Sequence, residues 1–428
     1  MAKKSLVRTV TTSMVGNLFE FYDFALFGYF APIIGKLFFP SDNPTVELIS
    51  AFGVFAAGFI VRPIGGLIFG HIGDIFGRKR ALVIAILLMS IPTAIIGLLP
   101  TFAQVGTLAP ILLVAMRMLQ GISLGGNYSG SITFVTEHTD PKHRGLMGGF
   151  AVASCLSGIL LGSATAAFFA QILSDQSLES YGWRIPFILG MFICFVGFYM
   201  RRKVDESPEF LEEQKSLNKQ LSHPFKEIAH KHKAQVTAVI GATMLHDLSF
   251  YLLFVYMTTY LTSVLGIPDE VSFTINTINL IVVSVVTVFA AWLSDKWGRK
   301  KILTCSALLF VIGTIPLMTM MSGKNTYVIF GAQLILAIAV GGYFGPIPAL
   351  MIEAFPTRVR YSASSMVTNI SGPLFGGTAP MLVTWLIAET GSNLVPAFYL
   401  TGVAVVAIIA IQLVKKVEPK AKVKSEHA

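Results

Sequence analysis

The sequence has 428 residues, of which 54% are hydrophobic and only 13% charged, and its mean hydropathy is +0.70. Soluble domains carry about 25% charged residues, so this composition excludes an ordinary soluble protein. The net charge is +9, but Lys and Arg fall in short clusters between apolar runs. That distribution is typical of loops at a membrane surface and argues against nucleic acid as a partner.

Apolar stretches long enough to cross a bilayer recur along the whole chain, since about 20 such residues span its hydrocarbon core. We predict twelve membrane-spanning helices near 10–36, 49–73, 80–99, 109–136, 145–173, 183–200, 234–264, 271–295, 300–321, 326–352, 359–388 and 393–414. The longest hydrophilic stretch follows the sixth. The sequence therefore predicts an all-α membrane protein with an N-terminal six-helix bundle (1–200), a cytoplasmic linker (201–233), a C-terminal six-helix bundle (234–414) and a short basic tail (415–428).

The basic residues of the loops alternate along the chain and set the expected orientation. The termini and loops on one side of the predicted helices carry Lys3, Lys4, Arg8, Arg78, Lys79, Arg80, Lys142, Arg144, Arg201, Arg202, Lys203, Lys296, Arg299, Lys300, Lys301, Arg358, Arg360, Lys415 and Lys416. The alternate loops contain few bases. Because basic loops stay in the cytoplasm, we expect both termini there, in a multi-pass protein of the cell inner membrane.

The two halves repeat each other. Asp74 and Arg78 recur 221 residues later (295 − 74) as Asp295 and Arg299, while Glu137 and Arg144 recur 216 residues later (353 − 137) as Glu353 and Arg360. These charges fall at the same ends of equivalent helices, beside glycines that allow helices to approach closely. We predict a cytoplasmic gate made of Gly70, Gly73, Asp74, Gly77, Arg78, Glu137, Arg144, Asp295, Arg299, Glu353 and Arg360, in which Asp74 pairs with Arg78 and Arg144.

Several ionisable residues fall near the middle of the predicted membrane, where a charge costs several kcal/mol and indicates function. Glu20 and Asp23 share one helix face, about 18–22 Å from Arg8 at 1.5 Å per residue. Burial and mutual repulsion favour protonation of at least one carboxyl group. We predict proton coupling by Glu20, Asp23 and Arg117. Arg62 and Arg117 are expected either to pair with these acids or to bind a substrate carboxylate.

Four segments of the first half resemble one known family. They are Gly16–Phe24, Phe59–Gly66, Gly70–Arg80 and Arg117–Gly126, and the last two of them have weaker copies in the second half. The pattern resembles the major facilitator superfamily, in particular its metabolite:proton symporter branch, with its proline/betaine-type transporters. The resemblance implies alternating access with twelve helices. Asn127 stands where that branch usually has an acidic residue, so the substrate does not follow from the resemblance.

The expected substrate-binding residues combine the buried charges with polar groups of the same helices. They are Asn17, Glu20, Tyr22, Asp23, Arg62, Arg117, Asn127, Tyr128, Asp247, Tyr251, Tyr343 and Asn369. His246 precedes Asp247 and offers a proton relay, although a lone histidine is more often a packing residue. Gly345–Pro346–Ile347–Pro348 and Gly372–Pro373 are expected to break two helices, and broken backbone at membrane depth tends to line a cavity.

These features predict a secondary transporter, not an enzyme, that imports a small zwitterion such as proline or betaine, or a carboxylate, together with protons. A proton-coupled antiporter or exporter on the same fold stays open as an alternative, as does a non-transporting solute receptor. No cofactor is expected, because no nucleotide-binding G-x-x-x-x-G-K-[ST] loop occurs, and the three separated cysteines predict neither a metal site nor disulfides. The expected partners are substrate, protons and the lipid bilayer, and we expect a monomer.

Overall fold

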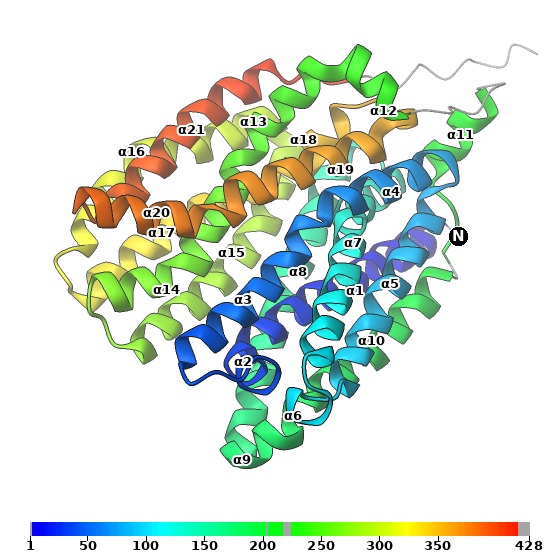
Figure 1. Cartoon of the computed structure of the whole chain (residues 1–428). Helices are drawn as coiled ribbons and strands as arrows, with labels where there is room; N and C mark the ends of the chain where they lie inside the picture. Colours follow the sequence, from blue (N-terminus) through cyan, green and yellow to red (C-terminus); the bar gives the residue numbers. More distant parts are fainter. Residues whose placement is uncertain (1, 203, 217–223, 418–428) are drawn as a thin grey trace, which may run out of the picture.

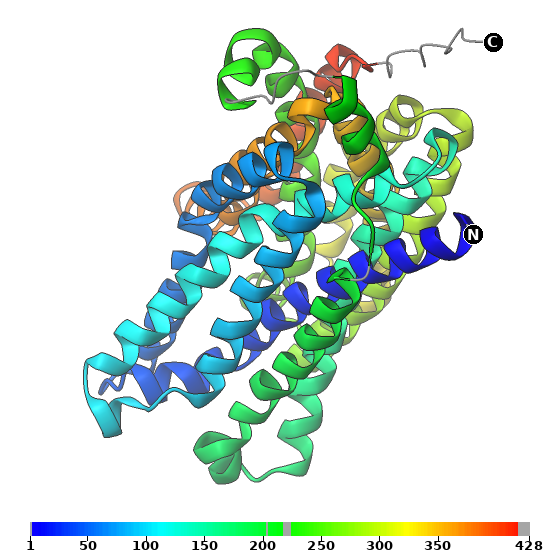
Figure 2. The ribbon, with the colours of Figure 1, turned by 90° about the vertical axis from the view of Figure 1, so that its right-hand side faces the viewer.

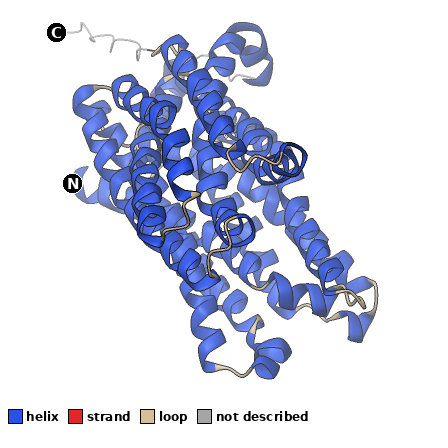
Figure 3. Ribbon diagram, turned by 90° about the vertical axis from the view of Figure 1, so that its left-hand side faces the viewer, coloured by secondary structure: helices blue, strands red, loops and turns tan. Residues whose placement is uncertain are grey.

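The computed structural model describes residues 2–202, 204–216 and 224–417, and the regular structure in these ranges is entirely helical (Figures 1 and 3). The predicted linker (201–233) and tail (415–428) therefore lie partly outside the described residues. Helices suit the sequence, because a helix satisfies its own backbone hydrogen bonds where no water is present.

The helices of the first half occupy the centre, bottom and right of Figure 1. They are α1 (Ala2–Tyr29), α2 (Ala31–Phe38), α3 (Pro44–Ile60), α4 (Arg62–Ile75), α5 (Arg78–Leu98), α6 (Phe102–Val105), α7 (Leu108–Glu137), η1 (Pro141–His143), α8 (Arg144–Ile172), α9 (Asp175–Ser177), η2 (Leu178–Gly182) and α10 (Arg184–Arg202). The η labels mark short 3-10 or π-helical turns.

The linker contributes the short helices α11, α12 and η3, and the second half, from α13 on, repeats the long helices of the first. In chain order the helices are α11 (Pro208–Ser216), α12 (Pro224–Glu227), η3 (Ile228–His232), α13 (Lys233–Phe250), η4 (Tyr251–Tyr256), α14 (Met257–Thr259), η5 (Tyr260–Val264), α15 (Asp269–Trp297), α16 (Arg299–Met321), α17 (Thr326–Phe344), α18 (Ile347–Glu353), η6 (Thr357–Val359), α19 (Arg360–Ser371), η7 (Gly372–Gly377), α20 (Ala379–Thr390) and α21 (Val395–Leu413).

Ten helices within the described residues are long and apolar enough to cross a membrane, and an eleventh span results if α1 and α2, which meet at a bend of 64°, count as one. Helix α10 coincides with the predicted span 183–200, although the side chains of residues 192–197 are not among those described. Large apolar side chains such as Ile60, Leu98 and Ile312 are exposed on the outer surface, as expected of a surface that faces lipid.

Both predicted helix breaks are confirmed. Helix α17 ends at Phe344 and α18 begins at Ile347, on either side of Gly345 and Pro346. Helix α19 ends at Ser371 and continues as the π-helical turn η7, which contains Pro373. Proline lacks an N–H group and clashes with the preceding helical turn, and a π-helical turn widens the helix locally.

The two halves pack side by side through a few helices. Helices α4 and α7 pack against α19, and α8 packs against α15. The hydrophobic core of the second half extends across this boundary to Ile132 of α7 and to Val152 and Leu156 of α8. The first half has a separate core around Leu26, Phe27 and Trp183. A polar cavity lies where the halves meet.

Candidate functional site

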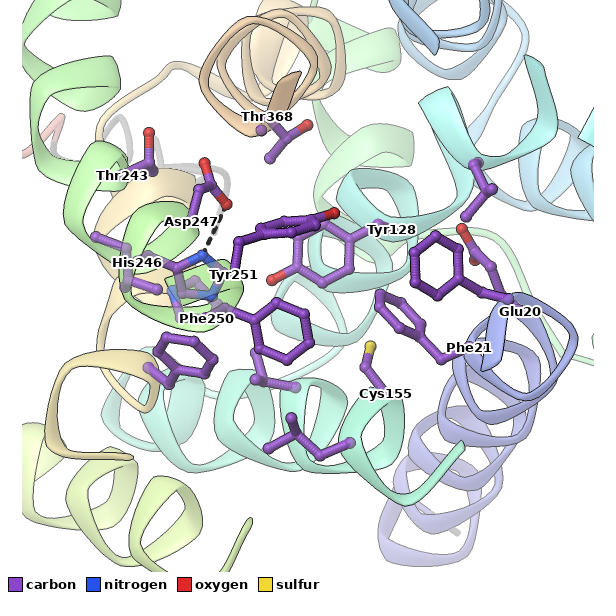
Figure 4. Close-up of a pocket in the computed structure, with 18 of the residues that line it drawn as sticks. Glu20, Phe21, Tyr128, Cys155, Thr243, His246, Asp247, Phe250, Tyr251 and Thr368 are labelled. Carbon is purple, nitrogen blue, oxygen red and sulfur yellow. Dashed lines mark hydrogen bonds and ion pairs between the residues drawn. The ribbon is translucent and has the colours of Figure 1, made fainter. Parts of the chain in front are cut away.

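The cavity between the halves has a volume of about 130 Å³ and is lined by both of them (Figure 4). Ligand pockets for drug-sized molecules begin at roughly 300 Å³, so this one fits a small solute. Its walls are Glu20, Phe21, Phe24, Arg62, Leu124, Tyr128, Val152, Cys155, Leu156 and Ile159 from the first half, and Thr243, His246, Asp247, Phe250, Tyr251, Phe344, Ile347, Pro348, Met351, Thr368, Asn369 and Gly372 from the second.

Glu20 is the carboxylate of the first half that faces the cavity. It is 2% exposed, and its Oε2 accepts a hydrogen bond from the side-chain amide of Asn127 on α7. Tyr128 lies between Glu20 and Asp247 in Figure 4, within electrostatic reach of both acids. The Asn127 amide thus supports Glu20 without adding a second negative charge.

Asp247 is the corresponding carboxylate of the second half. Its Oδ1 lies 3.0 Å from Nδ1 of His246, and its Oδ2 accepts a hydrogen bond of 2.5 Å from the hydroxyl of Ser371. Since His246 and Asp247 lie on α13 and Ser371 closes α19, these contacts join two helices of the same half. Asp247 is therefore held in a fixed orientation at the cavity wall.

Arg62 is the basic residue that lines the cavity. Its guanidinium group stacks on the ring of Phe59, 3.9 Å from the ring centroid, and lies within reach of the Tyr251 hydroxyl. The ion pairs found among the described residues do not include Arg62, in contrast to the predicted pairing with Glu20 or Asp23. Its charge is directed to the cavity and to aromatic rings.

Asp23 and Arg117 form a buried ion pair of 2.9 Å behind the cavity wall. Arg117 also donates a hydrogen bond of 2.7 Å to Gln120, which donates one of 2.7 Å to Thr93. The guanidinium carbon lies 3.7 Å from the ring centroid of Phe27. The predicted pairing of Arg117 with an acid of α1 is confirmed, but neither partner lines the cavity.

Half of the twelve expected substrate-binding residues line the cavity. They are Glu20, Arg62, Tyr128, Asp247, Tyr251 and Asn369. Asn127 reaches it only through Glu20, and Asp23 and Arg117 lie behind the wall. Asn17 donates a hydrogen bond of 3.2 Å to the Ala151 carbonyl, Tyr22 one of 3.2 Å to Pro186, and Tyr343 one of 2.6 Å to Ala242. These last three side chains are buried within their own halves and do not line the cavity.

The sequence prediction included Tyr128 and Tyr251 but omitted the phenylalanines of the lining. Phe21, Phe24, Phe250 and Phe344 contact the cavity, as does His246, which was expected as a proton relay. One signal was available, because Phe24 lies four residues after Glu20, and Phe250 and Tyr251 lie three and four after Asp247. Residues at these spacings share a helix face with the buried acid.

At the floor of the cavity, the two halves are joined through backbone carbonyl groups of α7. The side-chain amide of Asn369 donates a hydrogen bond of 2.6 Å to the Gly125 carbonyl, and the Tyr361 hydroxyl donates one of 3.0 Å to the Gly126 carbonyl. The Ser129 and Ser365 hydroxyls lie 2.6 Å apart just beyond. The paired glycines leave their carbonyls accessible, and a third side chain of α19 also uses this access, since the Ser365 hydroxyl donates a hydrogen bond of 3.4 Å to the Gly125 carbonyl.

Below the floor, the repeated Asp residues cap helices of the opposite half. Asp74 accepts hydrogen bonds from the backbone N–H groups of Tyr361 (3.2 Å) and Ser362 (2.8 Å) at the start of α19. Asp295 accepts the same pair from Gly145 (2.9 Å) and Leu146 (2.8 Å) at the start of α8. Helix N-termini have unsatisfied N–H groups and a partial positive charge, so each carboxylate ties the two halves together.

The repeated Arg and Glu residues form ion pairs next to these caps. Arg78 pairs with Asp74 at 3.3 Å and with Glu137 at 3.1 Å, and Glu137 also pairs with Arg360 of the other half at 2.9 Å. In the second copy, Arg299 pairs with Asp295 at 2.5 Å and with Glu353 at 3.2 Å. The pairing of Asp74 with Arg78 is thus confirmed.

The predicted pairing of Asp74 with Arg144 is wrong. Arg144 pairs with Glu209 of the linker helix α11, and Glu209 also pairs with Arg360 at 2.5 Å. Asp74 instead caps α19 and pairs with Arg78. The linker helices lie at this end of the molecule (Figure 2), and nothing in their hydrophilic sequence alone indicated that they complete the gate.

The glycines of the gate allow close approach and a tight turn. A Cβ atom on Gly73 would collide with the ring of Tyr361, and a Cβ on Gly70 would lie 2.9 Å from the Cα of Ser362. Gly77 has φ of +109°, and Gly298 in the second copy has φ of +97°. Glycine adopts such angles without strain. The expected gate residues therefore lie together at one end of the molecule, where they join the two halves.

Comparison with known proteins places this architecture in one family. A model described as sugar (and other) transporter matches residues 9–422. A proline/betaine transporter of Salmonella typhimurium is 33% identical over 412 residues, covering 94% of this chain and 82% of its own, and a putative proline/betaine transporter of Staphylococcus aureus is 34% identical over 409 residues, covering 95% and 88%. A solved structure of a major facilitator superfamily proton:xylose symporter with 6-bromo-6-deoxy-D-glucose is 19% identical, with a TM-score of 0.78 over 96% of this chain and 95% of that one.

Proposed function

The chain belongs to the sugar (and other) transporter family of the major facilitator superfamily, and from this premise we propose that it is a proton-coupled symporter that imports a small organic metabolite. The substrate class is a zwitterion such as proline or betaine, or a carboxylate. The relatives bearing the name proline/betaine transporter support this class, as does a cavity that presents charges of both signs.

We also propose the membrane arrangement that this function needs. Twelve spans in two six-helix bundles (1–200 and 234–414), joined by the linker 201–233, place both termini and the tail 415–428 in the cytoplasm. The protein then lies in the cell inner membrane and acts as a monomer. The gate caps and the linker helices share one end of the molecule, and the basic loops at that end support a cytoplasmic location for it.

The observation that carries the proposal is the position of Glu20. It is a buried carboxyl group on the wall of a small cavity, supported by the Asn127 amide, while the opposite wall carries Asp247. A buried carboxyl group favours its neutral form unless a positive partner is near. In the proposed cycle, Glu20 takes a proton from outside, substrate enters the neutralised cavity, and both leave together to the cytoplasm.

The gate supplies the alternation between the two faces. While Asp74 and Asp295 cap α19 and α8, the cytoplasmic end stays closed. Opening that end requires both caps and the Glu137–Arg360 pair to separate, which exchanges protein contacts for water. Such discrete rearrangement at an interface is how packed helices switch states. The residues Gly70, Gly73, Gly77, Arg78, Glu137, Arg144, Arg299, Glu353 and Arg360 take part in the same closure.

Proton movement during substrate addition tests this function. A thermal-shift screen of amino acids, betaines, keto acids and hydroxy acids on the purified protein first identifies a ligand. Proteoliposomes with an external pH indicator then receive that ligand. We expect the external solution to become more alkaline as substrate and protons enter together. Acidification would indicate antiport, and an unchanged pH with measurable uptake would exclude proton coupling.

A further inference from the structure

Another pocket lies at the gate end of the second half, between the N-terminus of α16 and the C-terminus of α21. Its volume is about 430 Å³, and apart from Pro141 its walls belong to the second half and to the residues that follow it. We propose that this pocket binds an anionic phosphate group, the chemistry that acidic lipids and soluble phosphates share. The inference goes beyond the proposed transport activity and does not depend on it.

Basic residues outnumber acids in the walls of this pocket. The charged residues that line it are Asp295, Arg299, Lys300, Lys301, Glu353, Lys415 and Lys416. Five bases and two acids give a net charge of +3 (5 − 2). Both acids are already engaged, since Asp295 caps α8 and pairs with Arg299, and Glu353 pairs with Arg299 and with Lys416. The excess positive charge is therefore left for an anion.

Helix α16 begins at this pocket. Gly298, directly before it, lines the pocket together with the first three residues of the helix. The first backbone N–H groups of a helix have no partner within the helix and carry a partial positive charge, so they attract phosphate groups. The Nε of Arg299 is also buried without a hydrogen-bond partner among the described residues. The pocket therefore combines backbone and side-chain donors.

In the first half, the equivalent position holds an anion. Gly77 there is the counterpart of Gly298, 221 residues earlier (298 − 77). The carboxylate of Glu206 in the linker accepts a hydrogen bond of 3.2 Å from the backbone N–H of Lys79, and a Cβ on Gly77 would collide with it. A Cβ on Gly298 would meet no described atom within 4 Å. The same turn and helix start that bind a carboxylate in one half are thus open to a ligand in the other.

The surroundings of the pocket favour a lipid as the source of the phosphate. Trp297 lines the pocket and is 61% exposed, and Leu413, next to the pocket residue Val414, is 63% exposed. Tryptophan is enriched where a membrane meets water, and basic pockets between helices bind lipid head groups there. Acyl chains of such a lipid would lie on the apolar surfaces of α16 and α21, where Leu309 and Ile409 are exposed. A soluble phosphate would use none of this surface.

Thermal unfolding of the purified full-length protein in detergent tests the inference, because a ligand that binds only the folded state raises the unfolding temperature. The lipid arm compares phosphatidylglycerol with phosphatidylcholine of the same acyl chains, whose ammonium group cancels the phosphate charge and is repelled by the lysines. The soluble arm compares sodium phosphate with sodium chloride at equal ionic strength. We expect phosphatidylglycerol to raise the unfolding temperature by about 3 °C or more beyond phosphatidylcholine, and phosphate to have a smaller effect.

Matched substitutions locate the site. Lys300→Gln/Lys301→Gln removes two positive charges from the pocket. Lys79→Gln/Arg80→Gln removes the same charge from the counterpart positions, where Glu206 already lies. We expect the pocket variant to lose most of the difference between the two lipids and the control variant to keep it. Each variant is compared with itself without lipid, so a change in its intrinsic stability does not affect the result.

The two arms also identify the source of the phosphate. A lipid difference that disappears only in the pocket variant assigns the site to an acidic lipid, and a phosphate effect with the same pattern but no lipid difference assigns it to a soluble phosphate. Equal shifts with both lipids and no effect of phosphate would overturn the inference, and this wild-type result holds even if a variant fails to fold. So would an equal phosphatidylglycerol effect in both variants. Proton-coupled uptake is measured separately, so either failure leaves the proposed function standing.

Discussion

At the scale of single residues, the same residue type performs different tasks according to its surroundings. Glu20 lines the cavity, whereas Asp23, one helical turn further along α1, is paired with Arg117 behind the wall. Removing one partner of a buried ion pair leaves an uncompensated charge and costs about 3–5 kcal/mol. A loss of stability of this size on removal of Asp23 would indicate a structural role, whereas a loss of uptake without a loss of stability would indicate a role in proton coupling.

We expect Asp23→Asn to lower the unfolding temperature of the detergent-purified protein by several degrees, because Arg117 then stays buried without a counter-charge. The double variant Asp23→Asn/Arg117→Met is expected to recover most of that loss. Thermal unfolding checks both. If the single variant unfolds like wild type but loses uphill uptake, Asp23 acts in proton coupling as the sequence predicted, and the structural account of this pair is wrong.

The carboxylates that cap helices of the opposite half can also be tested one residue at a time. Asp74→Ala removes two hydrogen bonds to the N-terminus of α19, and loss of a cap costs about 1 kcal/mol, roughly a fivefold change in a population ratio. The native cavity thiol Cys155 reports opening, in a background with Cys194 and Cys305 replaced by serine. We expect a membrane-impermeant thiol reagent on the gate side to label it several-fold faster.

The duplicated partner supplies the matched comparison for this variant. Asp295→Ala removes the equivalent cap from α8, so it is expected to accelerate labelling to a similar extent. Unchanged labelling in both variants would mean that the caps do not control the closed state.

At the scale of helices, closure depends on how near α7 and α19 can approach. A side chain on Gly130 of α7 would collide with the Tyr361 hydroxyl, whereas a side chain on Gly331 of α17 meets no atom within 4 Å. We expect Gly130→Val to hold the gate end apart and to raise labelling of Cys155 from that side, while Gly331→Val, with the same β-branched residue in a helix, leaves it unchanged. Equal labelling in the two variants would contradict the proposed role of this contact.

The sequence predicted these elements better than it predicted which side chains meet. The repeat of Asp74/Arg78 as Asp295/Arg299 located the charged contacts between the halves, because a duplicated unit brings the same charges to equivalent helix ends in both halves. Asn17 and Tyr343 were expected in the cavity but are buried elsewhere, because the rotation of a helix is set by packing on its neighbours. The phenylalanines of the lining were missed because, among 33 phenylalanines, only those spaced three or four residues from a buried acid stand out.

At the scale of the whole molecule, two halves enclose one small polar cavity and are held together at one end by contacts that occur twice. The gate combines the duplicated charges with Glu209 of the linker, whereas the cavity depends on side chains that no repeated motif includes, such as Arg62. We therefore propose that the shared fold alternates access and that individual side chains select the substrate and the proton.

The most direct test of this account is concentrative uptake by Glu20→Gln, which keeps the hydrogen-bonding shape of the side chain but cannot carry the proton. Proteoliposomes are given an acidic exterior and the radiolabelled ligand identified by the thermal-shift screen, and counterflow exchange is measured at equal pH on both sides. We predict that wild type accumulates the solute against its gradient, and that Glu20→Gln only equilibrates it while exchange persists. Uphill accumulation by Glu20→Gln at the wild-type level would contradict the account.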